Sequence, residues 1–106
     1  MTVRVWHPQV RLSRGFSVDE QMVNIIEMCF YHGWITTFSC QGGIMWPRRA
    51  VSPAYVAFAQ QDHLAFIDHV SQYLPESSLA VIGGSVPAVY FEPAMISEIE
   101  RALTQS

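Results

Sequence analysis

One short stretch of the chain combines residue types that could do chemistry. A β-branched run, Ile35-Thr36-Thr37, leads through Phe38 into Ser39 and Cys40, and Gln41, Gly42 and Gly43 follow directly. A thiol and a hydroxyl therefore stand at the end of an expected strand, beside glycines whose backbone can approach a ligand closely. We take Cys40 as the candidate catalytic residue and residues 39–43 as a candidate ligand-binding turn.

The chemistry of Cys40 depends on its surroundings. A reactive thiol needs a lowered pKa, supplied by an arginine, a protonated histidine or a helix N-terminus. A thiol at a strand end can equally be buried and inert, and the sequence leaves this choice open. Cys29 is expected to be a core residue, because it falls on the apolar face of a predicted helix.

A long connection follows the candidate turn. Residues 41–53 join two expected neighbouring strands, whereas hairpin loops usually have about two to five residues. The connection holds Trp46, Arg48 and Arg49. One interpretation is a lid over an anionic or planar ligand, in which these three side chains complete the site with the turn. The other is a surface loop whose Trp46 and Met45 fold back as a small satellite core.

The elements that position this turn can be predicted from periodicity. Strands are expected at 2–7, 35–40, 54–59, 79–82 and 86–91, the last two joined by a Gly83-Gly84-Ser85 hairpin turn. Ser17 and Glu20 form an expected capping box at the start of the first helix, and Gly33 ends it. Its predicted core face is Val18, Met22, Ile25, Ile26, Cys29 and Phe30.

Two further helices follow the same reasoning. Asp62 is expected to cap the second, whose predicted core face is Leu64, Ile67, Val70 and Leu74; Pro93 is expected to open the third. The order β-α-β-β-α-β-β-α predicts a single α+β domain over residues 1–106. Its architecture is a two-layer sandwich, with a mainly antiparallel sheet and helices on one face.

Composition excludes several functional classes. The 106 residues are 50% hydrophobic and 14% charged, with a net charge of −3, which argues against an extended nucleic-acid surface. No apolar run reaches the roughly 18 residues of a membrane span, and no signal peptide is recognisable, so we expect a cytoplasmic protein. The high apolar fraction favours a homodimer.

Cofactor and metal signatures are also lacking in the sequence. Neither a Walker loop nor a dinucleotide-binding fingerprint is present, so we expect no cofactor. Two cysteines are too few for a four-ligand zinc site. His63 and His69 are six residues apart and do not share a helix face as a metal-binding pair would, so no metal site is expected.

The segment from Val18 to Leu74 resembles a known group of proteins. The pattern Gly33, Thr36, Thr37, Ser39, Cys40, Gln41, Gly42, followed by Ala54-Tyr55-Val56-Ala57-Phe58, is similar to small uncharacterised proteins of actinobacterial phages and their hosts. Thr36, Ser39, Cys40 and Gly42 also resemble a Thr-x-Ser-Ser-Cys-Ser-Gly-Arg segment of the third enzyme of wybutosine synthesis, a tRNA-modifying methyltransferase family. Gln41 and Gly43 depart from that segment.

Three functions remain in view. The first is a binding protein, phage-encoded according to the resemblance, that acts on a host protein or a phosphate-bearing ligand. Arg48 and Arg49 would then lie within reach of the Ser39–Cys40 turn and make that end of the sheet positive. The second is a small enzyme or subunit that acts on a nucleotide or RNA through Cys40 and the arginines. The third is a structural dimeric subunit.

Overall fold

The computed structural model of the chain describes residues 9–12, 15–45 and 50–105. A four-stranded antiparallel sheet in the order β3-β6-β8-β7 forms one layer. Its strands are β3 (Thr36–Cys40), β6 (Ala54–Phe58), β7 (Ala80–Ile82) and β8 (Ala88–Phe91). The helices are α1 (Val23–Tyr31), α2 (Asp62–Val70) and α3 (Ile96–Thr104), with short 3₁₀ turns η1 (Glu20–Met22), η2 (Glu76–Ser78) and η3 (Pro93–Met95).

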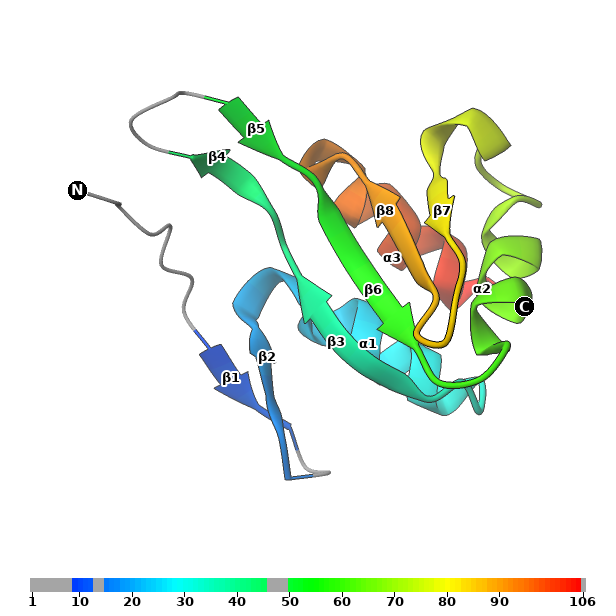
Figure 1. The fold of residues 1–106 in the computed structure, drawn as a ribbon, viewed down its shortest axis with the longest axis horizontal. Helices are drawn as coiled ribbons and strands as arrows, with labels where there is room; N and C mark the ends of the chain where they lie inside the picture. Colours follow the sequence, from blue (N-terminus) through cyan, green and yellow to red (C-terminus); the bar gives the residue numbers. More distant parts are fainter. Residues whose placement is uncertain (1–8, 13–14, 46–49, 106) are drawn as a thin grey trace.

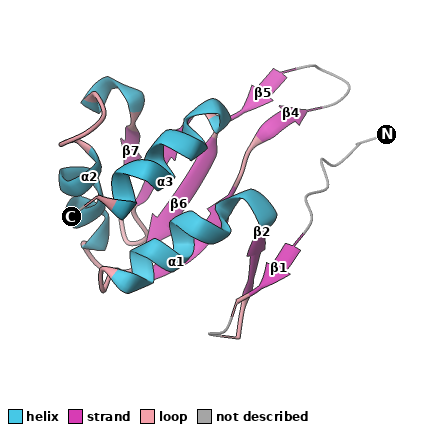
Figure 2. Cartoon of the chain, turned by 180° about the vertical axis from the view of Figure 1, so that it is seen from behind, coloured by secondary structure: helices cyan, strands magenta, loops and turns pink. Residues whose placement is uncertain are grey.

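The helices form the second layer. Figure 2 shows α1 and α3 lying across one face of the sheet, and α2 packs against α3 and the β6 and β8 strands. Figure 1 looks onto the opposite face, where no described element crosses the four strands. The predicted α+β two-layer sandwich, with a mainly antiparallel sheet and helices on one face, is confirmed.

The core lies between the two layers. Met22 at the end of η1 is fully buried, and so are Ile25, Ile26 and Cys29 on α1, as the helical period predicted. They meet Val56 and Phe58 of β6, Val89 and Phe91 of β8, and the apolar stripe of α3, which comprises Ile96, Ile99, Ala102 and Leu103. Burial of these side chains is the main driving force for joining helices and sheet.

Two short hairpins extend the sandwich. Strands β1 (Gln9–Arg11) and β2 (Ser17–Asp19) pair beside the outer edge of β3. Strands β4 (Gly43–Met45) and β5 (Ala50–Ser52) pair antiparallel and continue β3 and β6 beyond the helical layer (Figures 1 and 2). We call β4 and β5 the ribbon. The 41–53 connection is therefore built mainly of strand rather than loop in its described part.

The expected start of the first helix is wrong. Ser17 lies in β2 opposite Arg11, and α1 begins at Val23 after the η1 turn. The residue before η1 is Asp19, which makes no side-chain capping bond. A capping box needs only local spacing, but here strand pairing with β1 takes the Ser17 backbone away from the helix.

The second helix also differs at its start and on its buried face. Asp62 is its first residue rather than its cap, and the carboxylate accepts a hydrogen bond from the Ile35 amide at 2.8 Å. Leu64 is 55% exposed, whereas His63 and Phe66 are buried. The rest of the predicted face is confirmed, since Val70 is buried and Ile67 and Leu74 pack against the core. Phe66 takes the place expected for Leu64, because its aromatic ring packs on Phe58 of the sheet. The expected strand at 2–7 lies outside the described residues.

Candidate functional site

The turn between β3 and β4 is held by a buried carboxylate. Asp19, at the end of β2, is only 6% exposed, and one of its oxygens accepts a hydrogen bond from the Gln41 amide at 3.0 Å. Its other oxygen accepts from the side-chain amide of Gln9. A carboxylate removed from water is stable only when such donors satisfy it. Asp19 therefore ties the candidate turn to the β1–β2 hairpin.

A second link joins the same turn to η1. The side-chain oxygen of Gln41 accepts a hydrogen bond from the Gln21 backbone amide at 3.1 Å. That amide belongs to the first turn of a helical segment, where backbone donors have no helical partner. Gln41 is thus bonded through both its backbone and its side chain, which fixes the direction in which the chain leaves β3.

Gly42 is required by the geometry of this turn. Its φ is +69°, and a Cβ added there would lie 2.7 Å from the Ala54 amide nitrogen and the Pro53 carbonyl carbon, with the Ser52 carbonyl oxygen closer still. The strand that returns from the ribbon passes directly against this residue. Gly43 also has a positive φ, at +130°. The close backbone approach expected at Gly42 or Gly43 is confirmed for Gly42, and the neighbour is the chain itself.

The surroundings of Cys40 favour the protonated thiol over the thiolate. Burial raises the pKa of Cys40, and the Asp19 carboxylate raises it further, while a hydrogen bond from the Gly42 amide to the sulfur at 3.4 Å lowers it. The net direction is upward, so the thiolate is scarce at neutral pH. Nucleophilic cysteines need the opposite shift. Cys29 is buried in the core, and burial raises the pKa of its thiol as well.

The structure brings only part of the predicted site together. The structure keeps five of the predicted residues in one continuous segment at the joint between sheet and ribbon: Ser39 and Cys40 end β3, Gln41 and Gly42 connect the strands, and Gly43 begins β4. The other three predicted residues, Trp46, Arg48 and Arg49, lie outside the described residues, so their place in the site stays a prediction.

Sequence reasoning missed Asp19. It stands inside the segment interpreted as a capping box, and its role depends on a contact across 22 positions. The signal that could have indicated a buried carboxylate was the position of Asp19 directly after Val18, in a short alternation of apolar and polar residues.

A cluster of histidines and aromatic rings was also missed. The rings of His32 and Trp34 stack with centroids 4.5 Å apart, and the His69 ring lies 4.7 Å from that of His32. The Nε2 atoms of the two histidines lie 2.9 and 3.0 Å from the carbonyl oxygens of Leu103 and Ala102. A carbonyl only accepts, so each Nε2 carries the proton. His32, directly after α1, and His69, in α2, therefore both donate hydrogen bonds to the last turn of α3. The two rings thus link the three helices.

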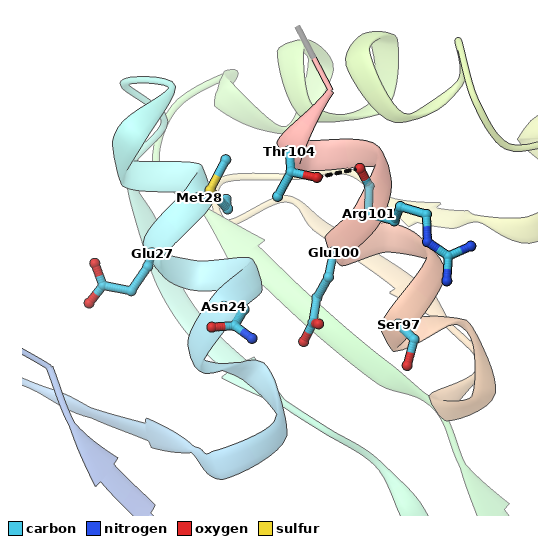
Figure 3. Close-up of a pocket in the computed structure, with 7 residues that line it drawn as sticks. All are labelled: Asn24, Glu27, Met28, Ser97, Glu100, Arg101 and Thr104. Carbon is cyan, nitrogen blue, oxygen red and sulfur yellow. Dashed lines mark hydrogen bonds between the residues drawn. The ribbon is translucent and has the colours of Figure 1, made fainter.

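Open grooves flank the sandwich away from this turn. One, of about 450 Å³, runs between α1 and α3 and is shown in Figure 3. Asn24 and Glu100 extend into the space between the helices, whereas Glu27 and Arg101 point outward to opposite sides. Another, of about 540 Å³, lies beside β7 and β8 and includes Ile82 and Tyr90. A smaller polar slot of about 170 Å³ separates β2 from β3.

The described residues offer neither a cluster of metal ligands nor a membrane-spanning helix. Residues 9–12, 15–45 and 50–105 contain no group of three or more His, Cys, Asp or Glu side chains placed to hold a metal ion. None of the helices in this part of the chain is long and apolar enough to span a bilayer. No protein-family model, curated protein or solved structure matches the sequence or its fold.

Proposed function

We propose that the protein is a binding protein that presents the β4–β5 ribbon and the segment between its strands to an acidic or phosphate-bearing partner. The observation that carries the proposal is the construction of the joint. The Gln41 amide bonds to Asp19 and the Gly42 amide to the Cys40 sulfur, so these two backbone donors are not free to bind an anion at the turn. The joint, residues 41–42 between the sheet and the ribbon, works as a rigid support. We assign the groups that bind the partner to positions further along the ribbon.

The sequence of the ribbon supports an anionic partner. Arg48 and Arg49 stand between β4 and β5 in the sequence, next to Trp46, and arginine binds carboxylates and phosphates through two parallel hydrogen bonds. These two residues account for a third of the six basic residues in a chain of net charge −3. A localised positive region on an acidic protein gives selectivity for an anionic partner and weak general affinity for nucleic acid. The resemblance to small phage proteins favours a host macromolecule as the partner.

The raised pKa of Cys40 weighs against the alternative of a cysteine-dependent enzyme acting on a nucleotide or RNA. Such an enzyme would need the thiolate at neutral pH, and the adjacent Asp19 carboxylate opposes its formation. A substrate phosphate approaching the same turn would also meet that carboxylate.

An NMR titration tests the proposal. The ¹⁵N-labelled protein is titrated with a glutamate-rich peptide, inorganic phosphate and a short RNA in separate experiments. We expect shifts confined to residues 43–52 with at least one of these probes, weakened by about 0.5 M salt because exposed charges are screened. The double variant Arg48→Ala/Arg49→Ala should lose the shifts, whereas Arg101→Ala, which removes an exposed arginine of α3, should keep them.

Two outcomes would overturn the proposal. One is the absence of shifts with all three probes at millimolar concentration. The other is an unchanged titration in the double variant. Shifts centred on Cys40 with the RNA alone would instead favour the enzyme alternative.

A further inference from the structure

The open face of the sheet carries two complete rows of side chains. Directly opposed residues of antiparallel strands point to the same face, so the strand register defines each row. The first row across β3, β6, β8 and β7 is Phe38, Ala57, Ala88 and Ile82. The second row is Cys40, Tyr55, Tyr90 and Ala80. The face opposite them holds the buried Val56 and Val89, so the two rows lie on the side away from the helices, toward the viewer in Figure 1.

These eight side chains are uncharged. Phe38 is 66% exposed and Ile82 is 58% exposed, while the rings of Tyr55 and Tyr90 pack together with centroids 5.2 Å apart at the centre. Ala57 and Ala88, which stand between the larger side chains, are themselves buried. Burial raises the pKa of Tyr55 and of Cys40, which keeps both neutral at physiological pH. Aromatic enrichment and depletion of charge characterise the centre of a protein interface.

The sizes in the two rows are complementary to each other. The first row reads large, small, small, large, and the second reads small, large, large, small. A twofold axis parallel to the plane of the sheet, perpendicular to the strands and above the line midway between the rows, would place each row over the other row of a second copy. Phe38 would then meet the partner's Cys40, and Tyr55 the partner's Ala57. Every large side chain would face a small one.

We propose that this open face is a homodimer interface in which two sheets pack face to face about that axis. The size order of the two rows supports a second copy as the occupant, because the face is complementary to itself. The net charge of −3 on each chain opposes association, and the uncharged contact surface adds no further repulsion to it. A twofold axis parallel to the strands would instead place Tyr55 over the partner's Tyr90 and Phe38 over the partner's Ile82, large on large, which close packing disfavours.

The area of the open face limits the affinity that we expect for the dimer. Four strands of three to five residues, about 4.8 Å apart, give a flat area of roughly 270 Å². A standard interface buries about 800 Å² on each partner. The two rows therefore form the centre of a modest interface, and we expect a dissociation constant in the micromolar range. This inference concerns the sheet face alone and does not depend on the ribbon.

Sedimentation equilibrium between about 5 and 500 µM tests the dimer. The wild-type mass should rise with concentration from 12.0 kDa toward twice that value. Ile82→Glu should raise the dissociation constant at least tenfold, because it would place a carboxylate in the interface. Val81→Glu is the matched control: it changes the adjacent residue of the same strand, which is 47% exposed and points to the other face. It should dimerise as wild type does.

Cross-linking tests the axis. A mixture of the Ala80→Cys and Ile82→Cys variants, treated with a short bis-maleimide, should give a cross-link between positions 80 and 82 of different chains. Ala80→Cys linked to the partner's Cys40 would instead indicate the axis parallel to the strands and overturn the arrangement. A wild-type chain that stays monomeric at 500 µM, or equal dissociation constants for Ile82→Glu and Val81→Glu, would overturn the interface itself.

Discussion

Replacing Gly42 with alanine should be among the most damaging single-methyl additions in this protein. Two separate costs apply at this position. The backbone has φ +69°, where a side chain adds about 1 kcal/mol of strain. The new Cβ would also lie 2.7 Å from backbone atoms of Pro53 and Ala54, well inside ordinary contact, and overpacking of this kind costs about 1–3 kcal/mol.

The expected total is a loss of about 3 kcal/mol in the free energy of unfolding. For a domain of this size, each kcal/mol lowers Tm by about 4–8 °C, so Gly42→Ala should melt roughly 15 °C below wild type. Backbone atoms cannot rotate away from the new Cβ as a flexible side chain can, so the steric clash is not relieved. Urea unfolding monitored by circular dichroism measures the same difference at constant temperature.

Alanine substitutions at two other glycines allow the cost of backbone strain to be measured separately from the cost of the steric contact. Gly33 has φ +88° and nothing within 4 Å of an added Cβ, so Gly33→Ala should carry the strain alone, about 1 kcal/mol. Gly83 is also open and has no positive φ, so Gly83→Ala should be neutral or slightly stabilising. If Gly42→Ala is no less stable than Gly33→Ala, the contact with the returning strand costs nothing and Gly42 is not required there for steric reasons.

Three further predictions concern the joint and the helix starts. Alkylation of Cys40 by iodoacetamide should be slow at pH 7 and rise only above the pH at which a free cysteine reacts; Asp19→Asn should speed it, because the carboxylate raises the Cys40 pKa. A rate profile centred at or below that of free cysteine would contradict this. Ser17→Ala should change the free energy of unfolding by less than about 0.5 kcal/mol, since Ser17 is an exposed strand residue and not a cap. Asp62→Ala should cost about 1 kcal/mol, because it removes the acceptor of the amide that precedes β3, whereas Asp68→Ala on the same helix should be nearly neutral in a thermal melt.

Local patterns predicted the layers of this fold well. The buried face of α1 and the hairpin at Gly83-Gly84-Ser85 follow from periodicity and turn chemistry, which act over a few residues. Pro93 opens the helical segment as predicted, although its first turn is the 3₁₀ turn η3 and α3 begins at Ile96. The antiparallel sheet followed in turn, because consecutive strands lacked crossover helices.

The features that could not be predicted depend on distant contacts. Asp19 reaches Gln41 across the gap between two hairpins, and the buried face of α2 is set by Phe66 packing on Phe58. The candidate turn was correctly placed at a close backbone approach. Its neighbour, however, is the chain returning toward β6, which only the three-dimensional path of the ribbon reveals.

The joint at Gly42 has a consequence for how this protein can vary. Because the turn is fastened to β2 and η1 on one side and packed against residues 52–54 on the other, the ribbon beyond it can change length without altering the core. Each added residue in one strand needs a counterpart in the other, and additions of two per strand keep the same side chains on the same face. The ribbon is thus an insertion point at which recognition could diversify, in nature or by grafting, while the sandwich stays constant.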